Sequence, residues 1–338
     1  MKKIILVVVM LIMAVLFVTS CSKTNNQEKI QTTEPIYNPL THEQVSSSQD
    51  LERRVFIVSI DNSPDARPQS GLSNADIIYE VPAEGGISRY LALFYVGNAD
   101  TIGPVRSARP YMVDIAREWN AVFVHCGWSE DAKAYLQKGY VDYINEFGFG
   151  SSFWRDKSRK APHNLYTSTE NLYAILDKKG WDSVSQTREF SFYSSDDILV
   201  GDKADLVDVN YPVAKNRYKY DTQSGLYLRY INSEPQIDPS NDKQIEVANI
   251  IVQKVSSKVL DSAGRLSINL TGSGEAILFS KGTVRIGTWK RADLNSPTYF
   301  CDDAGDEWQL APGKTWIQVC NQNVKISYQD TTATTDKE

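Results

Sequence analysis

Asp-Ile-Ile-Tyr-Glu-Val at residues 76–81 and Arg-Tyr-Leu-Ala-Leu-Phe-Tyr-Val at residues 89–96 are two runs that are apolar on both faces. Strands with this pattern are typically buried on both sides of a sheet. The intervening turn contains Glu84-Gly-Gly, so the two runs predict neighbouring strands joined by a tight connection. A third apolar run, at residues 55–60, ends in Asp61 and predicts another strand of the same sheet.

The stretch that follows these strands, Ile-Gly-Pro-Val-Arg-Ser-Ala-Arg-Pro at residues 102–110, predicts an anion-binding helix start. From Met112 onward, apolar residues recur at the spacing of one helix face. Ser107 is the predicted N-cap, with a proline in the first turn. Free backbone N–H groups beside the guanidiniums of Arg106 and Arg109 would attract an anion.

The expected chain direction groups the candidate site residues. If the helix after residue 110 makes a right-handed crossover from strand 89–96 to strand 121–124, the latter ends beside the arginines. Asp61 joins them if the first strand is antiparallel to the second. The primary ligand-binding or catalytic candidates are Asp61, Arg106, Ser107, Arg109 and His125.

In a second group of candidates, Glu80, Glu84 and Arg89 are expected at the opposite end of the sheet, whereas His163 and Asn164 are candidates to contribute to the primary site. The members of the second group are Arg67, Glu80, Glu84, Arg89, His163 and Asn164. For Glu80, a buried ion pair with Arg89 is favoured over a catalytic role, because the glycine turn would bring the two together. A glycosidase-like pair of carboxylates is the functional alternative.

Residues 1–20 resemble a secretory signal, since Lys2 and Lys3 precede an unbroken apolar run at residues 4–18. A helix that spans a bilayer needs roughly 20 residues, so this run is short for one. Small residues directly before Cys21 resemble the bacterial lipoprotein signal, in which that cysteine is lipidated. An uncleaved membrane anchor is the alternative. We expect the protein on the outer face of the cytoplasmic membrane, anchored by acyl chains at Cys21.

Composition divides the remaining 318 residues into four segments. Residues 21–50 hold the lipidated cysteine and a polar, disordered tether. Residues 51–188 predict an α/β domain, a mixed sheet in layers with helices on one side. Residues 189–328 lack helix patterns and predict a mostly antiparallel β domain. Residues 329–338 are expected to be a disordered tail.

Charge and residue types limit the chemistry. The net charge of −6 argues against a nucleic-acid partner. No cysteine or histidine spacing is typical of a metal site, so no metal or cofactor is expected. Of the histidines, we expect only His125 and His163 in the folded part. Cys301 and Cys320 form a disulfide only if their strands are neighbours, which the sequence leaves open, and Cys126 is expected in the core.

Several motifs resemble the YerB-like lipoproteins of Gram-positive bacteria, which consist of two domains of unknown function. The motifs are Ala66-Arg-Pro-Gln-Ser-Gly-Leu72, Ala75-Asp-Ile-Ile-Tyr-Glu80, Glu84-Gly-Gly-Ile-Ser-Arg89, residues 103–110, Ala161-Pro-His-Asn-Leu-Tyr166, Gly264-Arg265, Gly272-Ser-Gly274 and Pro312-Gly-Lys-Thr-Trp316. The resemblance covers residues 55–319 and implies an envelope lipoprotein with layered sheets. One departure is Gln236, where relatives often carry a histidine. The family supplies no activity.

Two functional interpretations remain. The first is a surface binding or accessory module that holds an anionic envelope component or an envelope protein. The second is an envelope hydrolase or transferase, with His125 as acid or base and the arginines stabilising negative charge. The first is preferred because no nucleophile lies beside an evident base in the sequence.

Overall fold

The computed structural model describes residues 35–181, 188–194, 197, 199 and 201–331. The predicted signal, Cys21 and most of the predicted tail lie outside the described residues, so the structure does not bear on them. Within the described part, no helix is long and apolar enough to cross a membrane.

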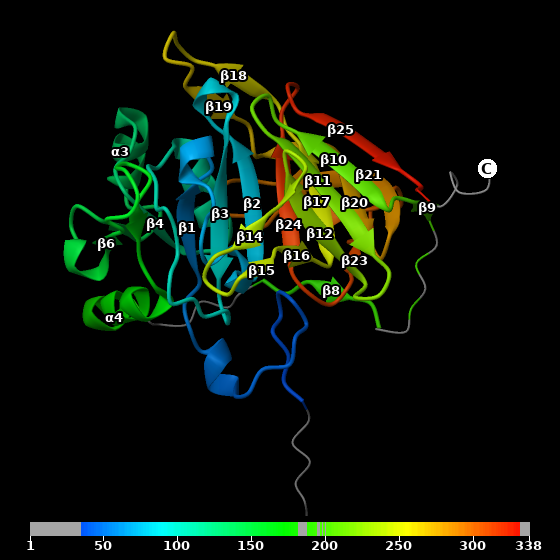
Figure 1. Ribbon diagram of the computed structural model, residues 1–338, viewed down its shortest axis with the longest axis horizontal. Coiled ribbons are helices and arrows are strands. Elements are labelled where there is room, and N and C mark those ends of the chain that lie inside the picture. The colour runs from blue at the N-terminus through cyan, green and yellow to red at the C-terminus, as the bar shows by residue number, and fades with distance from the viewer. Residues whose placement is uncertain (1–34, 182–187, 195–196, 198, 200, 332–338) are drawn as a thin grey trace, which may run out of the picture. The chain divides into compact units, whose positions relative to one another are not determined.

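One large sheet of eleven strands takes members from both halves of the sequence (Figure 1). Its main path runs in the order β22, β21, β20, β17, β24, β2, β3, β1, β4, β5, and β9 pairs with β21. The strands are β1 (Phe56–Asp61), β2 (Ile77–Pro82), β3 (Ser88–Phe94), β4 (Val122–His125), β5 (Tyr143–Asn145), β9 (Asp202–Lys203), β17 (Asn249–Lys254), β20 (Gly272–Ser280), β21 (Thr283–Arg291), β22 (Tyr299–Cys301) and β24 (Thr315–Cys320).

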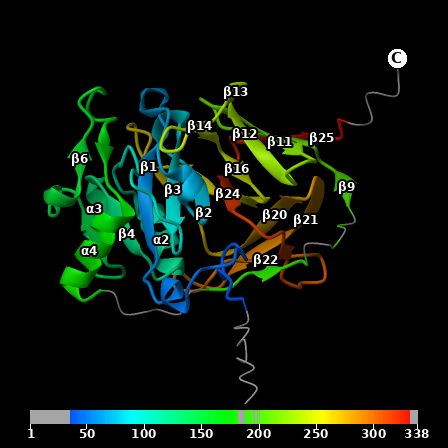
Figure 2. The same ribbon diagram turned by 60° about the horizontal axis from the view of Figure 1, so that its bottom comes forward.

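A second sheet covers one face of the C-terminal part of the first, and Figure 2 shows the two layers. Its strands are β10 (Leu206–Asn210), β11 (Lys215–Asp221), β12 (Leu226–Ile231), β13 (Glu234–Pro235), β16 (Glu246–Val247) and β25 (Lys325–Gln329). Short pairs complete the strands: β6 (Trp154–Arg155) with β7 (Leu165–Tyr166), β8 (Ser191–Phe192) with β23 (Gln309–Leu310), β14 (Ile237–Asp238) with β15 (Lys243–Gln244), and β18 (Ser257–Val259) with β19 (Leu266–Ile268).

Alternating side chains of the large sheet fill two separate cores, as the period of a strand requires. On one face, Ile57 and Leu91 pack with α2 (Pro110–Glu118) and α3 (Glu130–Leu136). On the other face, Val58 and Ala92 pack with α4 (Thr169–Lys179) and with the second sheet. The predicted fold class is confirmed. The expectation that all helices lie on one side is wrong for α4, because its apolar stripe faces the opposite core.

Strand direction differs from the prediction in one respect that decides the site. β3 is antiparallel to β1 and β2, whereas β4 is parallel to β1. Therefore β1, β2 and β4 all end at the same edge of the sheet, where β3 begins. The predicted crossover had β4 parallel to β3.

β24 joins the two predicted domains into a single sheet. It lies between β2 and β17 and is parallel to both, as the red and cyan ribbons of Figure 1 show. The predicted boundary near residue 188 therefore separates two segments of sequence, but it does not separate two sheets.

The predicted tether ends earlier than expected. Leu40 is fully buried, and the amide of Asn38 donates to the Asp76 carboxylate over 2.6 Å. His42 stacks between the rings of Tyr37 and Phe192, so a third histidine belongs to the folded part. Residues from 36 onward pack on the fold because Asp76 offers a buried acceptor that the sequence pattern did not reveal.

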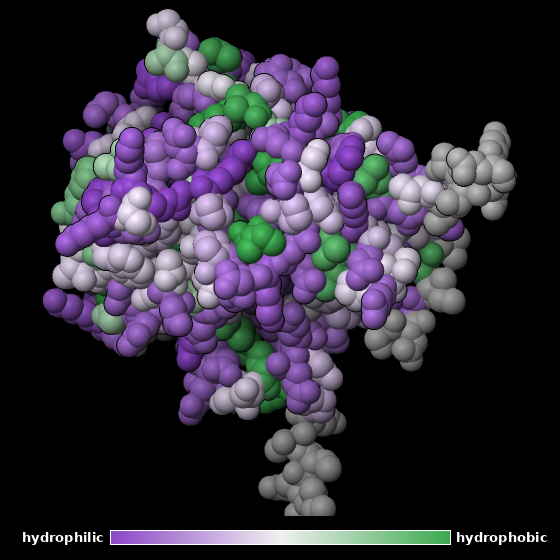
Figure 3. All heavy atoms as spheres, viewed as in Figure 1, coloured by the Kyte–Doolittle hydropathy of each residue, from purple (hydrophilic) through white to green (hydrophobic). Residues whose placement is uncertain are grey.

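The surface in Figure 3 is largely hydrophilic, with apolar residues in small separate groups. One such group lies at the end of the projecting β18–β19 hairpin, where Val259 is 67% exposed and Leu260 54%.

Candidate functional site

A cluster of charged side chains lies where β1 and β2 end and β3 begins. Residues after β3 return along β1 before α2 starts: Asp61 N–H donates to the Pro104 carbonyl, and Arg106 N–H to the Ser59 carbonyl, both over 2.8 Å. This return places Arg106 at the end of the sheet where Glu84 and Arg89 lie. The prediction that Arg106 lies at the opposite end of the sheet from Glu84 and Arg89 is wrong, because it did not include the return of the chain along β1.

Asp61 organises the exposed part of the cluster. Its side chain is almost fully buried and accepts two hydrogen bonds, from Ser63 N–H at 3.0 Å and from His163 Nδ1 at 2.8 Å. It also forms an ion pair with Arg106, whose Nε lies 3.2 Å from a carboxylate oxygen. Burial raises the pKa of this carboxyl, but the Ser63 N–H, the charges of Arg89 and Arg106 and the His163 bond lower it further, so the net shift is downward. Asp61 is therefore a carboxylate at neutral pH.

Arg106 is held by one end only. Its Nε forms an ion pair with Asp61 at 3.2 Å, while its two terminal nitrogens form no hydrogen bond with any residue that the structure describes. The side chain is 30% exposed. A guanidinium fixed at Nε with both terminal nitrogens unoccupied presents a planar fork, the geometry that binds a carboxylate or phosphate with two bonds.

Arg89 supplies a buried positive charge next to this fork. It is 3% exposed and sits opposite Asp61 in the β1–β3 register. One terminal nitrogen donates to the Ser107 carbonyl over 2.6 Å, but Nε is buried and has no hydrogen-bond partner among the described residues. Burial, then the charge of Arg109, lowers the pKa of Arg89 to about 10, so it is still protonated at pH 7. A buried donor without a partner is costly unless something accepts from it.

Arg109 is saturated by its neighbours. Nε and one terminal nitrogen bond the Glu84 carboxylate over 2.5 and 3.1 Å, and the other terminal nitrogen bonds Ser107 Oγ and the Ala108 carbonyl. Burial raises the pKa of Glu84, but Arg109 lowers it more strongly. The prediction that Ser107 is the N-cap of α2 is wrong. The N-cap is Arg109, and its side chain makes no capping hydrogen bond. Ser107 instead accepts from the two flanking arginines.

His125 does not join the charged cluster. Its ring is fully buried against Phe123, Trp128 and Tyr143, and Nδ1 bonds the Gly127 carbonyl over 2.8 Å. Burial lowers its pKa to about 4, so the ring is neutral at pH 7. The histidine that contacts Asp61 is His163, a candidate of the second group.

Glu80 forms a buried ion pair, as favoured, but its partner is not Arg89. Register places Arg89 opposite Val81, on the other face of the sheet. Glu80 instead bonds Arg229 of the second sheet over 2.8 Å, and both side chains are fully buried. Gln236 accepts from another nitrogen of Arg229. Sequence reasoning missed Arg229 because it lies on a strand of ordinary amphipathic pattern.

The remaining candidates support loops. Arg67 donates to the Asn62 side chain and carbonyl over 3.1 Å. Asn164 accepts from Arg155 over 3.0 Å and donates to the carbonyls of Asp156 and Arg159. The Asn164 bonds hold the loop that carries His163, and the Arg67 bonds hold the loop that follows β1.

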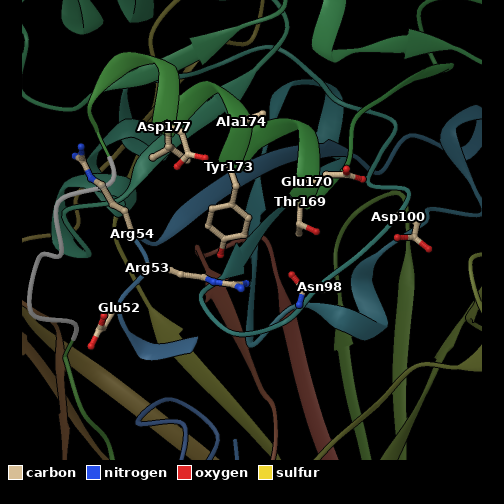
Figure 4. Close-up of a pocket in the computed structure, with 11 residues that line it drawn as sticks. Glu52, Arg53, Arg54, Asn98, Asp100, Thr169, Glu170, Tyr173, Ala174 and Asp177 are labelled. Carbon is tan, nitrogen blue, oxygen red and sulfur yellow. The ribbon is translucent and has the colours of Figure 1, made fainter. Parts of the chain in front are cut away.

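The net charge of this cluster differs from that of the hollow at the opposite end of the strands. Three guanidiniums, of Arg89, Arg106 and Arg109, face two carboxylates, of Asp61 and Glu84, which leaves one excess positive charge. At the opposite end, a hollow of about 670 Å³ is lined by two arginines and four acidic residues (Figure 4). Its members include Arg53, which lies 5.0 Å from the centre of the Tyr173 ring. The electrostatics there do not favour an anion.

Thiol and metal chemistry gain no support in the described ranges. Cys126, Cys301 and Cys320 are free there, so Cys301 and Cys320 do not pair. Burial, then the Glu146 carboxylate, raises the pKa of Cys126 to about 11, which makes it a poor nucleophile. No group of three or more histidine, cysteine, aspartate or glutamate side chains converges to hold a metal among those residues.

Comparison with known proteins gives consistent matches. The family model for the N-terminal domain of a protein of unknown function, DUF3048, matches residues 40–182, and the model for its C-terminal domain matches residues 207–317. The chain is 38% identical over 272 residues to "Putative lipoprotein YerB" of Bacillus subtilis (strain 168), covering 79% of this chain and 81% of the relative. The crystal structure of YerB protein from Bacillus subtilis superposes with a TM-score of 0.78 at 34% identity, covering 86% of this chain and 99% of the other.

Proposed function

We propose that this chain, which belongs to the DUF3048 family, is a lipoprotein whose folded part binds an anionic component of the cell envelope. The small residues before Cys21 support lipidation there, and the Bacillus relative carries the name of a lipoprotein. The anchor places the protein on the outer face of the cytoplasmic membrane. An anionic envelope protein would present the same chemistry to the cluster as an anionic polymer.

The unoccupied fork of Arg106 is the observation that carries the binding role. Asp61 fixes one edge of the guanidinium, so little side-chain entropy is lost when an anion bonds the other edge. Arg89 adds a second cation with a buried, unpartnered Nε. Glu84 neutralises Arg109, and the excess charge therefore resides at Arg89 and Arg106. The protein as a whole is acidic, so this attraction is local.

A thermal-shift measurement tests the proposal. The full chain in detergent is heated with inorganic phosphate or with poly(glycerol phosphate), alongside Arg106→Ala and the control Arg217→Ala. Arg217 is a partly exposed arginine that pairs with Asp208 on β10, away from the cluster. The anion should raise the melting temperature of the parent and of Arg217→Ala, but not of Arg106→Ala. Equal responses of all three proteins would exclude the Arg106 site.

The Asp61–His163 pair supports a second candidate function, an envelope hydrolase. Asp61 binds Nδ1, and the other ring nitrogen forms no hydrogen bond within the described part, so it is free to accept a proton. Ser63 Oγ lies 3.2 Å from the same Nδ1, which is not the arrangement of a nucleophile and its base. Release of soluble fragments from purified cell walls by the parent, and not by His163→Gln, would favour this function.

A further inference from the structure

Beside β5, the edge strand of the large sheet, a second hollow of about 700 Å³ opens to solvent. Aromatic rings from the ends of β4 and β5 and from the segment after α4 line it. They belong to Trp128, Tyr143, Phe147, Phe149 and Trp181. This concentration of rings around one hollow is typical of a ligand site, because flat rings provide large rigid contact area.

The rings form walls and leave the space between them open. The Trp128 ring meets that of Tyr143 at 82° and that of Phe147 at 75°, with centroids 6.4 and 6.5 Å apart. Phe147 is 72% exposed, although an aromatic ring gains free energy when it is buried. Edge-to-face contacts of this kind fix the orientation of the rings and leave their faces free to contact a ligand.

Polar groups lie behind and around the rings. His125, which packs on Trp128 and Tyr143, has a buried Nε2 without a partner. Asn145 lines the hollow; its side-chain oxygen accepts from the N–H groups of Gly127 and Phe147, which orients its amide nitrogen away from them. An apolar surface with a few fixed polar groups is the usual composition of a small-molecule site.

The charge left at the rim is positive. Lys179 lies over the rings of Phe149 and Trp181, and Lys133 lies over Trp128. Neither lysine forms an ion pair with a residue in the described ranges. The acidic residue of the lining, Asp142, is engaged by Arg54 at 2.6 Å.

The segment that carries Trp128 pairs with the arginine segment of the cluster. Residue 128 forms a parallel bridge with Ala108, which stands between Ser107 and Arg109. The Ala108 N–H donates to the Gly127 carbonyl over 3.0 Å, and Cys126 N–H donates to the Arg106 carbonyl over the same distance. Paired backbones lie about 4.8 Å apart, so the segment that bears Trp128 and the segment that bears Arg106 and Arg109 are neighbours.

We propose that this aromatic hollow is a saccharide subsite, and that the ligand of the whole surface is a glycan whose sugars carry negative charges. Pyranose rings have apolar faces that stack on aromatic side chains and hydroxyls that bond groups such as Asn145 and Lys179. The anionic groups of the same ligand would reach Arg106, and that part rests on the proposed function. An extended peptide fits less well, because β5 offers an edge of only three residues.

Calorimetric titration of the full chain in detergent tests the subsite with two glycans of equal length. One is a neutral oligomer of N-acetylglucosamine, and in the other alternate sugars carry a carboxylate. Phe147→Ala removes an exposed ring of the hollow, and Tyr299→Ala, on the opposite edge strand β22, removes a ring that is 44% exposed. Both variants should melt within a few degrees of the parent.

We expect the parent and Tyr299→Ala to bind both glycans, the acidic one more tightly. Phe147→Ala should weaken both by roughly threefold to tenfold, the value of one aromatic contact. Arg106→Ala should weaken only the acidic glycan. If neither glycan binds, or if Phe147→Ala binds the glycans like Tyr299→Ala, the saccharide subsite is refuted. This conclusion does not depend on the result of the thermal-shift measurement with phosphate. If the Phe147 effect appears while Arg106→Ala changes nothing, the subsite stands and the anion site fails.

Discussion

Two carboxylates lie near the ends of the strands that flank β3, Glu80 on β2 and Asp61 on β1, and their surroundings differ sharply. Glu80 is fully buried between the sheets and accepts from five donors. Its partner Arg229 has all three guanidinium nitrogens bonded and lies 4.2 Å from the centre of the Trp316 ring. Asp61 accepts hydrogen bonds from two donors, and its ion-pair partner Arg106 keeps two terminal nitrogens unbonded in the described part.

The difference shows how the same pair of residue types serves two purposes. A saturated pair between two sheets fixes their relative position and leaves no group for a ligand. An unsaturated pair at the rim retains binding capacity, and its own contact is weakened by solvent. Changes at Arg229, Asp61 and Arg106 test this contrast, and the buried His125 gives a third environment for comparison; the four predictions follow in order of the expected effect.

Breaking the saturated pair should have the largest effect. Arg229→Ala leaves the Glu80 carboxylate buried without its cation, which typically costs about 3–5 kcal/mol of unfolding free energy. Urea unfolding measures the change. The double variant Glu80→Gln with Arg229→Met should recover part of the loss, because it buries no charge. A loss below about 1 kcal/mol for Arg229→Ala would contradict the central role of this pair.

His125 should give the parent a pH-dependent stability. Its folded pKa of about 4 lies below the unfolded value of 6.5, so the unfolded state binds more protons between these values. The stability from the neutral buried ring is present above pH 6.5 and is lost as pH falls towards 4, by on the order of 2–3 kcal/mol. Unfolding free energies from pH 7 to 4 should show this slope in the parent and not in His125→Phe. A slope of equal size in the variant would assign it to other groups.

Asp61→Asn should cost less, about 1–2 kcal/mol at pH 7, because it weakens charge-assisted bonds at a rim. The pKa of Asp61 is lower in the folded state than its ordinary value of 3.8. Its stabilisation is therefore present above pH 3.8 and is lost as pH falls below it. Denaturation curves of the two proteins should converge between pH 4 and pH 2. A difference that grows in acid would reverse the sign assigned here.

Arg106→Ala should change stability least, by less than about 1 kcal/mol, because a part-exposed ion pair contributes little. Its effect should appear in anion binding. Arg106→Lys sharpens the test, since lysine keeps the charge and loses the planar fork. Binding of phosphate by Arg106→Lys should lie between that of the parent and that of Arg106→Ala. Full binding by the lysine variant would show that charge alone suffices.

Local patterns predicted the elements but not how they are placed. Runs of apolar residues located β1, β2 and β3. The direction of β4 was mispredicted because the segment between β3 and α2 has no periodicity, so its return along β1 left no signal. Pairing there depends on backbone bonds such as that from Arg106 to Ser59.

Local patterns also predicted only part of the candidate site. The motif at residues 102–110 identified Arg106, Ser107 and Arg109, which do lie together. His163 and Asp61 are 102 residues apart in sequence, and Glu80 and Arg229 are 149 apart. Contacts over such separations are set by the sheet register, which one sequence without relatives does not reveal.

The position of β24 has a consequence for the order in which the molecule can form. Residues 315–320 occupy the middle of the large sheet, between β2 and β17, although they come near the end of the chain. A chain synthesised from its N-terminus therefore carries β2 with an open edge until nearly all of the protein has been made. The last folded segments to leave the ribosome close its centre. Any truncation before residue 315 would leave two incomplete sheets with exposed edges.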